Sequence, residues 1–179
     1  MLEYLIFIYD YLIIYLLSTF NLLIKNKNKN NNIYVSLTTI PSRSKNIIYT
    51  INSIMNQTIN PQKIFITISK KNLREEHINY QLHDIIKNHP LIEIIISERD
   101  NGPINKLYGG ILKCKNENDI IITVDDDSIY NRNMIKNIYE QSKIYKEQVV
   151  GTIGRIEYDQ KIFGYNQYIP RKVKILEGY

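Results

Sequence analysis

An apolar run that ends in three consecutive carboxylates constrains this chain more than any other stretch. Residues 119–127 read Asp-Ile-Ile-Ile-Thr-Val-Asp-Asp-Asp, and Ile120–Val124 has the length and β-branched composition of a buried strand. Three adjacent acids repel one another unless a cation or a helix N-terminus compensates their charge. In open α/β sheets, ligands bind just outside the carboxyl ends of the strands. The pattern therefore predicts a ligand site at the end of this strand.

Two interpretations of the acidic triplet remain open at this point. Two of its carboxylates could hold a divalent metal whose remaining positions are filled by phosphate oxygens. Alternatively, the triplet is an acidic turn that caps a helix beginning near Asn131.

Strand and helix patterns alternate from Ile33 onward, which is typical of an α/β domain with a mostly parallel sheet flanked by helices. Ser44 is a plausible N-cap for the first of these helices, and Pro103 suits the first turn of a later one. Strands are expected at 33–37, 64–68, 91–96, 120–124 and 149–158, and helices around 47–55, 73–87, 103–111 and 134–139.

Composition narrows the function classes. The 179 residues give room for one domain with a real core. The net charge of +5 comes from scattered lysines rather than one dense patch, so we expect no nucleic-acid partner, whereas modest basicity suits an anionic small ligand. The single cysteine, Cys114, excludes an intrachain disulfide and a Cys-based zinc site.

The N-terminal segment Leu2–Ile24 is almost continuously apolar, with Glu3, Asp10 and Asn21 as polar interruptions. A central Asp costs roughly 3 kcal/mol on insertion, and about a dozen Leu, Ile and Phe residues outweigh it. We therefore expect a transmembrane or signal-anchor helix at 1–24, a polar linker at 25–32 and the folded domain at 33–179. The alternative is an amphipathic helix that lies on a membrane or a partner.

The lysines after this segment predict its orientation. Lys25, Lys27 and Lys29 follow it directly, whereas Glu3 precedes it. By the positive-inside rule, the chain would be a single-pass membrane protein whose globular domain faces the cytoplasm.

Four separated motifs occur in a fixed order along the folded part: Val35-Ser-Leu-Thr-Thr-Ile-Pro-Ser-Arg43, Gln57, Asp100-Asn-Gly-Pro-Ile-Asn-Lys106, and Asp125-Asp-Asp127 with Tyr130 close behind. In this combination the chain resembles glycosyltransferases of the GT-A fold, specifically the family-2-like set with a DxD motif. The likeness covers Ile33 to about Tyr158. It implies a Rossmann-like domain that binds a nucleotide-sugar donor, such as a UDP- or GDP-sugar.

The resemblance implies roles for residues outside the triplet. Thr38 and Thr39 would lie against the nucleotide base, and Asp100 would meet the base or ribose. Arg43 would pair with phosphate or a nearby acid, and Lys106 would reach the diphosphate as a point charge. Arg43 could instead be a surface cation, and Asp100 could instead cap the helix that follows it.

Within the triplet, the resemblance implies that Asp125 lies near the ribose and, with Asp127, faces the metal. Asp126 would belong to the donor site but point into the sheet edge. Oxygen ligands, with no cysteine or histidine cluster, favour Mn²⁺ or Mg²⁺ over zinc. The ion would bridge the donor's two phosphates.

The expected function is transfer of a sugar, of the hexosyltransferase type, to an unknown acceptor. Such enzymes need a second half with the acceptor site and, when inverting, a general base. The sequence ends at Tyr179, and Asp159 and Glu177 are the only carboxylates beyond Glu157. We therefore expect the base to be missing, and a truncated donor-binding half or an inactive scaffold remnant is the second hypothesis.

A third hypothesis is a phosphatase of the haloacid dehalogenase type, in which Asp-x-Asp after an apolar strand marks the nucleophile. In that class the motif normally ends the first strand, whereas three strand patterns precede it here. This hypothesis is accordingly the weakest of the three.

Overall fold

The structure, a computed structural model, describes residues 2–24, 32–146, 149–151, 154–158 and 161–165, with side chains placed for 4–24, 32–146 and 149–151. The chain divides into two compact units, Met1–Asn133 and Met134–Tyr179. All of the candidate site lies in the first unit.

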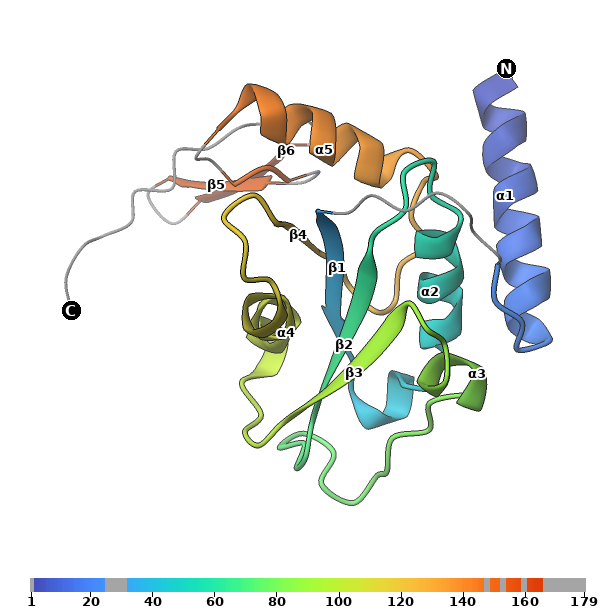
Figure 1. Cartoon of the computed structure of the whole chain (residues 1–179), viewed down its shortest axis with the longest axis vertical. Helices are drawn as coiled ribbons and strands as arrows, with labels where there is room; N and C mark the ends of the chain where they lie inside the picture. Colours follow the sequence, from blue (N-terminus) through green and yellow to red (C-terminus); the bar gives the residue numbers. More distant parts are fainter. Residues whose placement is uncertain (1, 25–31, 147–148, 152–153, 159–160, 166–179) are drawn as a thin grey trace. The chain divides into compact units, whose positions relative to one another are not determined.

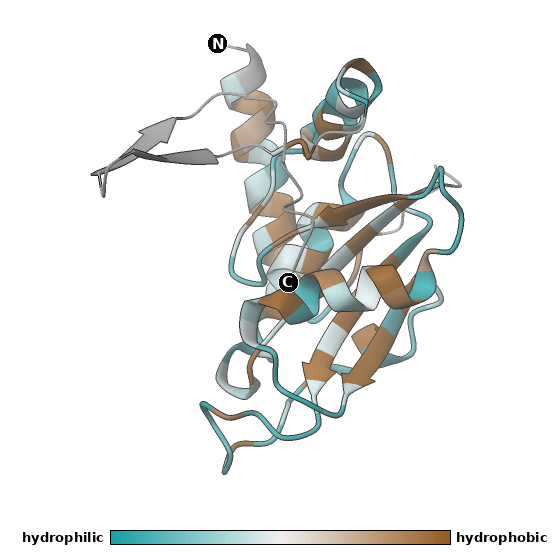
Figure 2. Ribbon diagram, turned by 90° about the vertical axis from the view of Figure 1, so that its left-hand side faces the viewer, coloured by the Kyte–Doolittle hydropathy of each residue, from teal (hydrophilic) through white to brown (hydrophobic). Residues whose placement is uncertain are grey.

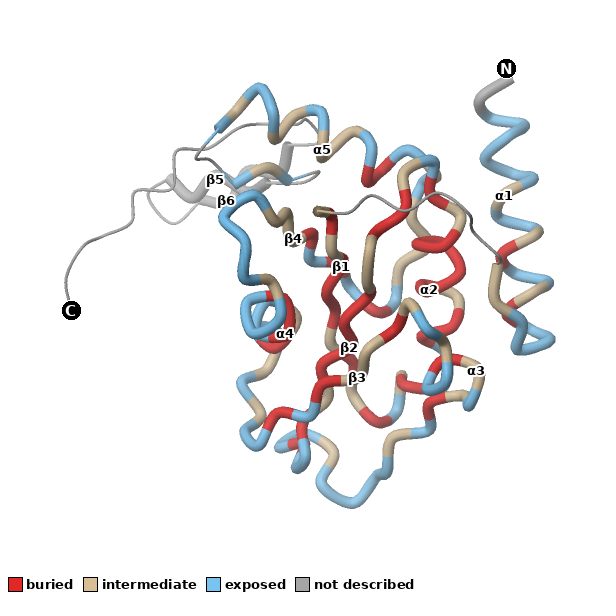
Figure 3. The backbone as a smooth tube through the Cα atoms, viewed as in Figure 1, coloured by how far each residue is buried: buried red, intermediate tan, exposed pale blue. Residues whose placement is uncertain are grey.

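The first unit is built on a four-stranded parallel sheet with strand order β3-β2-β1-β4. Its strands match the four predicted apolar runs to within a residue or two, and their Ile- and Val-rich inner positions form a buried core (Figure 3). The strands are β1 (Ile33–Thr38), β2 (Lys63–Ser69), β3 (Ile92–Ser97) and β4 (Ile120–Thr123). The expected α/β class with a mostly parallel sheet is confirmed.

Helices cover both faces of this sheet (Figure 1). Helix α4 lies on one face, while α2 and α3 lie on the other, with α1 outside α2. The helices of this unit are α1 (Leu2–Thr19), α2 (Ile47–Met55), α3 (Asp84–Lys87) and α4 (Asn105–Lys113), with short 3₁₀ turns η1 (Pro41–Arg43) and η2 (Gly102–Ile104).

Helix α4 approaches the sheet closely because it has glycine where it crosses the strands. A Cβ atom on Gly109 would stand 2.2 Å from Thr67 Oγ1 and 3.2 Å from Ile95 Cδ1. Gly110 would likewise meet Ile121 Cγ2 at 2.5 Å. These two glycines set the depth at which α4 packs on the sheet.

The helix predicted over residues 73–87 is wrong for most of its length, since only Asp84–Lys87 is helical. Side chains bind the backbone groups that a helix would have used. Asn72 Oδ1 accepts the N–H groups of Arg74 and Glu75, both at 3.1 Å, and Ser44 Oγ accepts that of Gln81 at 2.8 Å. This segment is therefore a loop over the carboxyl end of β2.

The prediction that Ser44 is the N-cap of α2 is wrong. The cap position belongs to Asn46, which makes no capping bond with its side chain. Ser44 Oγ instead donates to the carbonyl oxygen of Pro41 at 2.6 Å while it accepts from Gln81. The hydroxyl thus closes η1 and tethers the loop before α3.

Helix α1 ends earlier than the predicted anchor. The chain leaves the helix after Thr19: Asn21 takes a φ of 54°, and Leu22 N–H donates to Leu17 O at 2.8 Å. Its 18 residues span about 27 Å, against about 30 Å for a hydrocarbon core. Across the described residues, no helix combines the length and apolar character that a bilayer crossing requires. The predicted transmembrane helix is not found, and the predicted orientation stays untested.

A buried asparagine ties α1 to α2. Asn52 is fully buried, and its side chain donates to Ser18 Oγ at 2.9 Å and to Leu22 O at 2.8 Å while accepting from Ile24 N–H at 2.9 Å. Ile14 packs in the same seam and is 1% exposed. The end of α1 is thus docked on the domain by polar as well as apolar contacts.

The second unit contains helix α5 (Met134–Ile144) and an antiparallel hairpin of β5 (Gly154–Tyr158) and β6 (Lys161–Tyr165). The predicted helix is confirmed. The strand predicted over 149–158 is found as β5 in its second half, and β6 was not predicted.

Candidate functional site

The acidic triplet lies at the point where the order of the sheet reverses. Strands β1, β2 and β3 follow one another across the sheet, whereas β4 pairs with the opposite side of β1. A cavity lies at the carboxyl ends of β1 and β4, which is where ligands bind in such folds. Val124 N–H continues the ladder to Ser36 O at 3.1 Å, so the triplet starts directly beside Thr38 and Thr39.

The crevice is a cavity of about 190 Å³. It brings together every residue that was assigned to the donor site, from three segments of the chain, together with several that were not. Its lining consists of Thr38, Thr39, Ile40, Arg43, Ser69, Asn72, Arg74, Asp100, Gly102, Pro103, Lys106, Asp125, Asp126 and Asp127.

The outer two carboxylates of the triplet are exposed and paired with cations. Lys106 Nζ lies 2.8 Å from Asp125 Oδ1, and Arg43 Nη1 lies 2.7 Å from Asp127 Oδ2. The side chains of Asp125 and Asp127 remain 64% and 56% exposed. Exposed pairs of this kind contribute about 0–1 kcal/mol to stability. Lys106 can therefore turn to another anion at little cost, whereas Arg43 also lies against the buried carboxylate of Asp126.

The middle carboxylate has a different environment. Asp126 is 5% exposed, accepts the Thr39 hydroxyl at 2.5 Å on one oxygen, and has Arg43 Nη1 3.2 Å from the other. Burial raises the pKa of Asp126, although the Thr39 hydrogen bond and the Arg43 charge act in the opposite direction. Asp126 thus joins β1 to the triplet and points inward, as predicted.

Neighbouring elements fix the backbone of the triplet. Thr50 of α2 donates its hydroxyl toward the carbonyl oxygens of Asp126 and Ser128, both at 2.9 Å. The Tyr130 hydroxyl accepts Asp125 N–H at 2.8 Å, and burial raises the pKa of that phenol. The outer carboxylates are therefore presented by a loop that is held from both sides.

Gln57 plays a supporting role. Its side-chain amide donates to Ser53 O at 3.0 Å and to Asn131 O at 2.8 Å, and the residue is 3% exposed. It joins the end of α2 to the chain that follows the triplet and lies outside the cavity lining. The alternative interpretation of the triplet as a cap for a helix near Asn131 is wrong, since α5 begins only at Met134.

Thr38 and Thr39 line the cavity, but both hydroxyls have protein acceptors. Thr38 Oγ1 donates to Thr67 O at 2.8 Å, while Thr39 Oγ1 donates to Asp126. The side chains thus build the floor of the crevice.

Asp100 stands on the opposite wall and connects two loops. Its carboxylate accepts Leu73 N–H and Gly102 N–H, both at 2.9 Å. Burial acts to raise the pKa of Asp100, but these two backbone hydrogen bonds, a hydrogen bond from Ser69 and the charge of Arg74 together lower it. Gly102 follows at a φ of 62°, a conformation that glycine adopts without strain. The cap position of η2 belongs to Asn101, which makes no capping bond with its side chain, so the alternative prediction that Asp100 is the helix cap is wrong.

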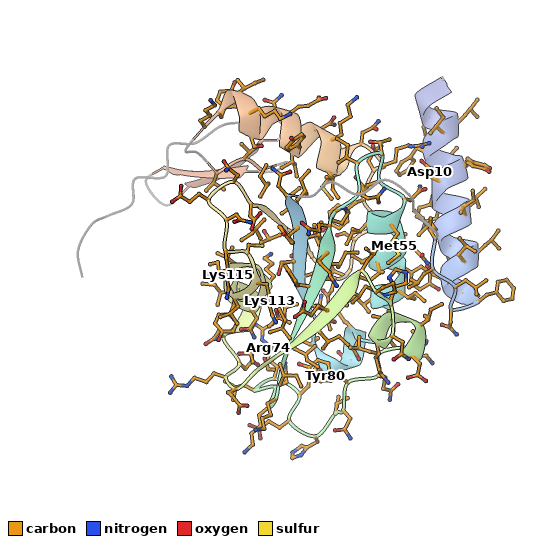
Figure 4. All side chains as sticks on the ribbon, in the orientation of Figure 1. Asp10, Met55, Arg74, Tyr80, Lys113 and Lys115 are labelled. Carbon is orange, nitrogen blue, oxygen red and sulfur yellow. The ribbon has the colours of Figure 1, made fainter. Side chains whose placement is uncertain are left out.

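Arg74, Ser69 and Asn72 belong to the lining, although the sequence interpretation missed them. Figure 4 shows Arg74 near the carboxyl ends of the strands. Ser69 closes β2, and the rule that marked the ends of β1 and β4 could have found it. This rule could not have found Arg74, because the segment that contains it was predicted to be a helix and not a loop after a strand.

The residues present fit a divalent cation that arrives with a phosphate ligand. Among the described residues, no group of three or more His, Cys, Asp or Glu side chains could hold a metal ion. Mg²⁺ and Mn²⁺ do not require one, since one or two carboxylates and the oxygens of a bound phosphate commonly complete their coordination. Asp125 and Asp127 offer such oxygens on the cavity surface, whereas Asp126 is engaged elsewhere.

Comparison with known proteins bears on this site. The family model for glycosyl transferase family 2 matches residues 39–177, most of the chain. A comparison with curated proteins finds no match. The phosphatase hypothesis is wrong, because the triplet follows the fourth strand and the matched family is another one. The parallel sheet, the crevice at its switch point and the family match agree: the chain belongs to glycosyl transferase family 2.

Proposed function

We propose that the crevice binds the diphosphate of a nucleotide-sugar donor and that the chain acts in transferring a hexosyl group from it to an acceptor hydroxyl. The observation that carries this proposal is the pairing of exposed carboxylates with exposed cations around one cavity. Two carboxylates alone would repel a diphosphate, and three cations alone would not hold a metal. Together they suit a diphosphate that binds with a metal ion.

Three cations stand around the cavity in positions to contact phosphate: Arg43, Arg74 and Lys106. Arg43 offers a planar fork that matches phosphate oxygens, and Lys106 offers a point charge. When a diphosphate enters, Lys106 and Arg43 exchange weak, exposed carboxylate partners for phosphate oxygens.

Asp125 and Asp127 would then hold Mn²⁺ or Mg²⁺. When bound, the ion supplies positive charge that stabilises the departing diphosphate as a Lewis acid. Asp100, Gly102 and Thr38 border the remaining space of the cavity, where the ribose and base would lie.

In the transfer, the bond between the sugar's anomeric carbon and the diphosphate oxygen breaks, and a bond to the acceptor oxygen forms. The acceptor's proton passes to a general base. Asp159 and Glu177, the carboxylates that the sequence offers beyond Glu157, lie outside the described residues. The described cleft therefore accounts for the donor side of the reaction.

Calorimetric titration of the full chain with UDP and GDP, with and without Mn²⁺, tests this proposal. We expect binding that needs Mn²⁺ and that weakens by roughly tenfold or more in Asp127→Asn, since a direct ligand is removed. Glu98→Gln is the matched control, because this exposed acid pairs with Lys70 outside the cavity. Equal affinity with and without Mn²⁺, or in Asp127→Asn and the parent chain, would reject the metal assignment.

A second candidate is a scaffold whose carboxylates are structural. The observation that favours it is that Asp125 and Asp127 already have cationic partners within the protein. It predicts that neither nucleotide binds and that removing Asp127 lowers only the free energy of unfolding. The same titration, combined with denaturant unfolding of Asp127→Asn, separates the two.

A further inference from the structure

Helix α1 carries a broad apolar surface on the side away from α2. Its large apolar side chains have exposed fractions of up to 70%, and in Figure 3 most of the helix is coloured as exposed. The most exposed are Tyr4, Leu5, Phe7, Tyr9, Tyr11, Leu12, Tyr15, Leu16 and Phe20. Figure 2 shows the helix banded in hydrophobic colour along its length.

The surface is larger than a folded monomer usually exposes. With about 150–250 Å² per aromatic side chain, its six aromatic residues alone present on the order of 700 Å². The largest apolar patch on a typical monomer is about 300–600 Å² and is often functional. This helix therefore has the character of an interaction surface.

The polar groups of α1 are turned toward the domain. Ser18 is 2% exposed and bonds with Asn52. Asp10, the residue that opposed membrane insertion, faces Arg132, with Asp10 Oδ2 3.7 Å from Arg132 Nη1 and its side chain 13% exposed (Figure 4). The outward face over residues 4–20 consequently presents no charged side chain, and its polar atoms are the tyrosine hydroxyls and the hydroxyl of the exposed Thr19.

We propose that this face of α1 binds the surface of an anionic lipid bilayer, with the helix lying in the plane of the interface. The charge pattern favours an anionic surface: Lys25, Lys27 and Lys29 lie six to ten positions after the end of α1 in the sequence, and the chain carries a net charge of +5. Apolar side chains entering the headgroup boundary next to a short basic segment make up the two-part signal of interfacial anchors.

The aromatic content agrees with this occupant. Tyrosine places an apolar ring and a polar hydroxyl at the boundary between hydrocarbon and headgroups, and it is enriched there. Four tyrosines, Tyr4, Tyr9, Tyr11 and Tyr15, are exposed on α1.

Vesicle flotation of the full chain tests this inference. We expect it to float with phosphatidylcholine vesicles that contain phosphatidylserine, and to bind pure phosphatidylcholine roughly a hundredfold more weakly, since each nearby lysine contributes about a factor of five. The double variant Leu12→Glu/Leu16→Glu should lose flotation. Leu73→Glu/Ile96→Glu, which places two glutamates at other exposed apolar positions, should retain it.

Two outcomes would overturn the inference. One is equal flotation of both double variants, and the other is a concentration-dependent dimer in sedimentation equilibrium with no flotation of the parent chain. The experiment is independent of the donor site, because Asp127→Asn should float like the parent chain whether or not it binds nucleotide.

Discussion

At the scale of single residues, the ion pair between Lys106 and Asp125 contributes less to folding than the same lysine would contribute to binding a phosphate. The pair joins a residue of α4 to the triplet at 2.8 Å, with the lysine 30% and the aspartate 64% exposed. An exposed pair contributes at most about 1 kcal/mol to folding. The same ammonium against a bound phosphate makes a charge-assisted hydrogen bond of about 1.5–3 kcal/mol.

The first prediction concerns this lysine. Lys106→Ala should change the free energy of unfolding by less than about 1 kcal/mol. It should weaken Mn²⁺-dependent UDP binding roughly ten- to hundredfold. Urea unfolding and calorimetry measure the two quantities, and Lys70→Ala is the control, because Lys70 pairs with Glu98 outside the cavity. Loss of stability without loss of affinity would assign Lys106 a structural role only.

The second prediction concerns Asp100, whose pKa lies below its unfolded value because two backbone N–H groups, Ser69 and the charge of Arg74 together outweigh burial. A carboxyl group with a lowered folded pKa contributes stability above its unfolded pKa, and this contribution is lost as the pH falls through the folded pKa. Asp100→Asn should therefore cost about 1 kcal/mol at neutral pH and progressively less in acid. Unfolding measured between neutral pH and acid checks this, and a deficit that does not depend on pH would contradict it.

The sequence predicted most of the residues that line the cleft, but it did not predict their hydrogen-bond and ion-pair partners. The family resemblance assigned Thr39 and Asp100 to the site, and Asp125 was found because it follows a strand whose carboxyl end lies at the edge of the sheet where ligands bind. That Asp126 is buried against Thr39, with both its oxygens engaged, depends on how the chain packs 87 positions apart. The pattern of apolar and polar residues within one segment does not predict a contact between residues so far apart in the sequence.

At the scale of elements, the β-branched runs were predicted well because burial and β-propensity point the same way there. The structure of residues 73–83 was predicted wrongly. The spacing of their apolar residues is helical, but side chains from other segments bind their backbone groups. Asp100 holds Leu73, and Ser44 holds Gln81. Tertiary hydrogen bonds of this kind override helical periodicity, so Arg74 was missed.

The third prediction concerns the contact between α4 and the sheet. In Gly109→Ala the new methyl group would collide with Thr67 Oγ1, a short, stiff side chain that cannot swing away. Overpacking of this kind costs about 1–3 kcal/mol. Urea unfolding measures the loss, and Ile111→Ala, at an exposed position of the same helix, should cost less. Equal losses would show that α4 does not depend on the close approach.

The first unit combines a parallel sheet, covered by helices, with helix α1 docked on the outside of α2. Asn52 is the main polar link, since its side chain bonds to three groups at the end of α1. Removing its side chain leaves the part-buried carbonyl of Leu22 and the part-buried N–H of Ile24 without this partner, at up to about 1–3 kcal/mol each.

The fourth prediction follows from this link. Asn52→Leu should raise amide hydrogen exchange in residues 4–24 while the amides of β1 and β2 keep their protection. Exchange followed by mass spectrometry reports both regions, and Asn46→Ala, an exposed asparagine at the start of α2, is the control. Uniformly increased exchange would mean that α1 and the sheet unfold as one unit.

The most direct measurement of the central claim is the paramagnetic effect of Mn²⁺ on the amide resonances of the isotope-labelled chain in the presence of UDP. Mn²⁺ bound by Asp125 and Asp127 should broaden the signals of Arg43, Asp100, Lys106 and the triplet first, and far less so in Asp127→Asn. Broadening centred on other residues, or equal broadening in that variant, would contradict the claim that these carboxylates hold the metal and the diphosphate.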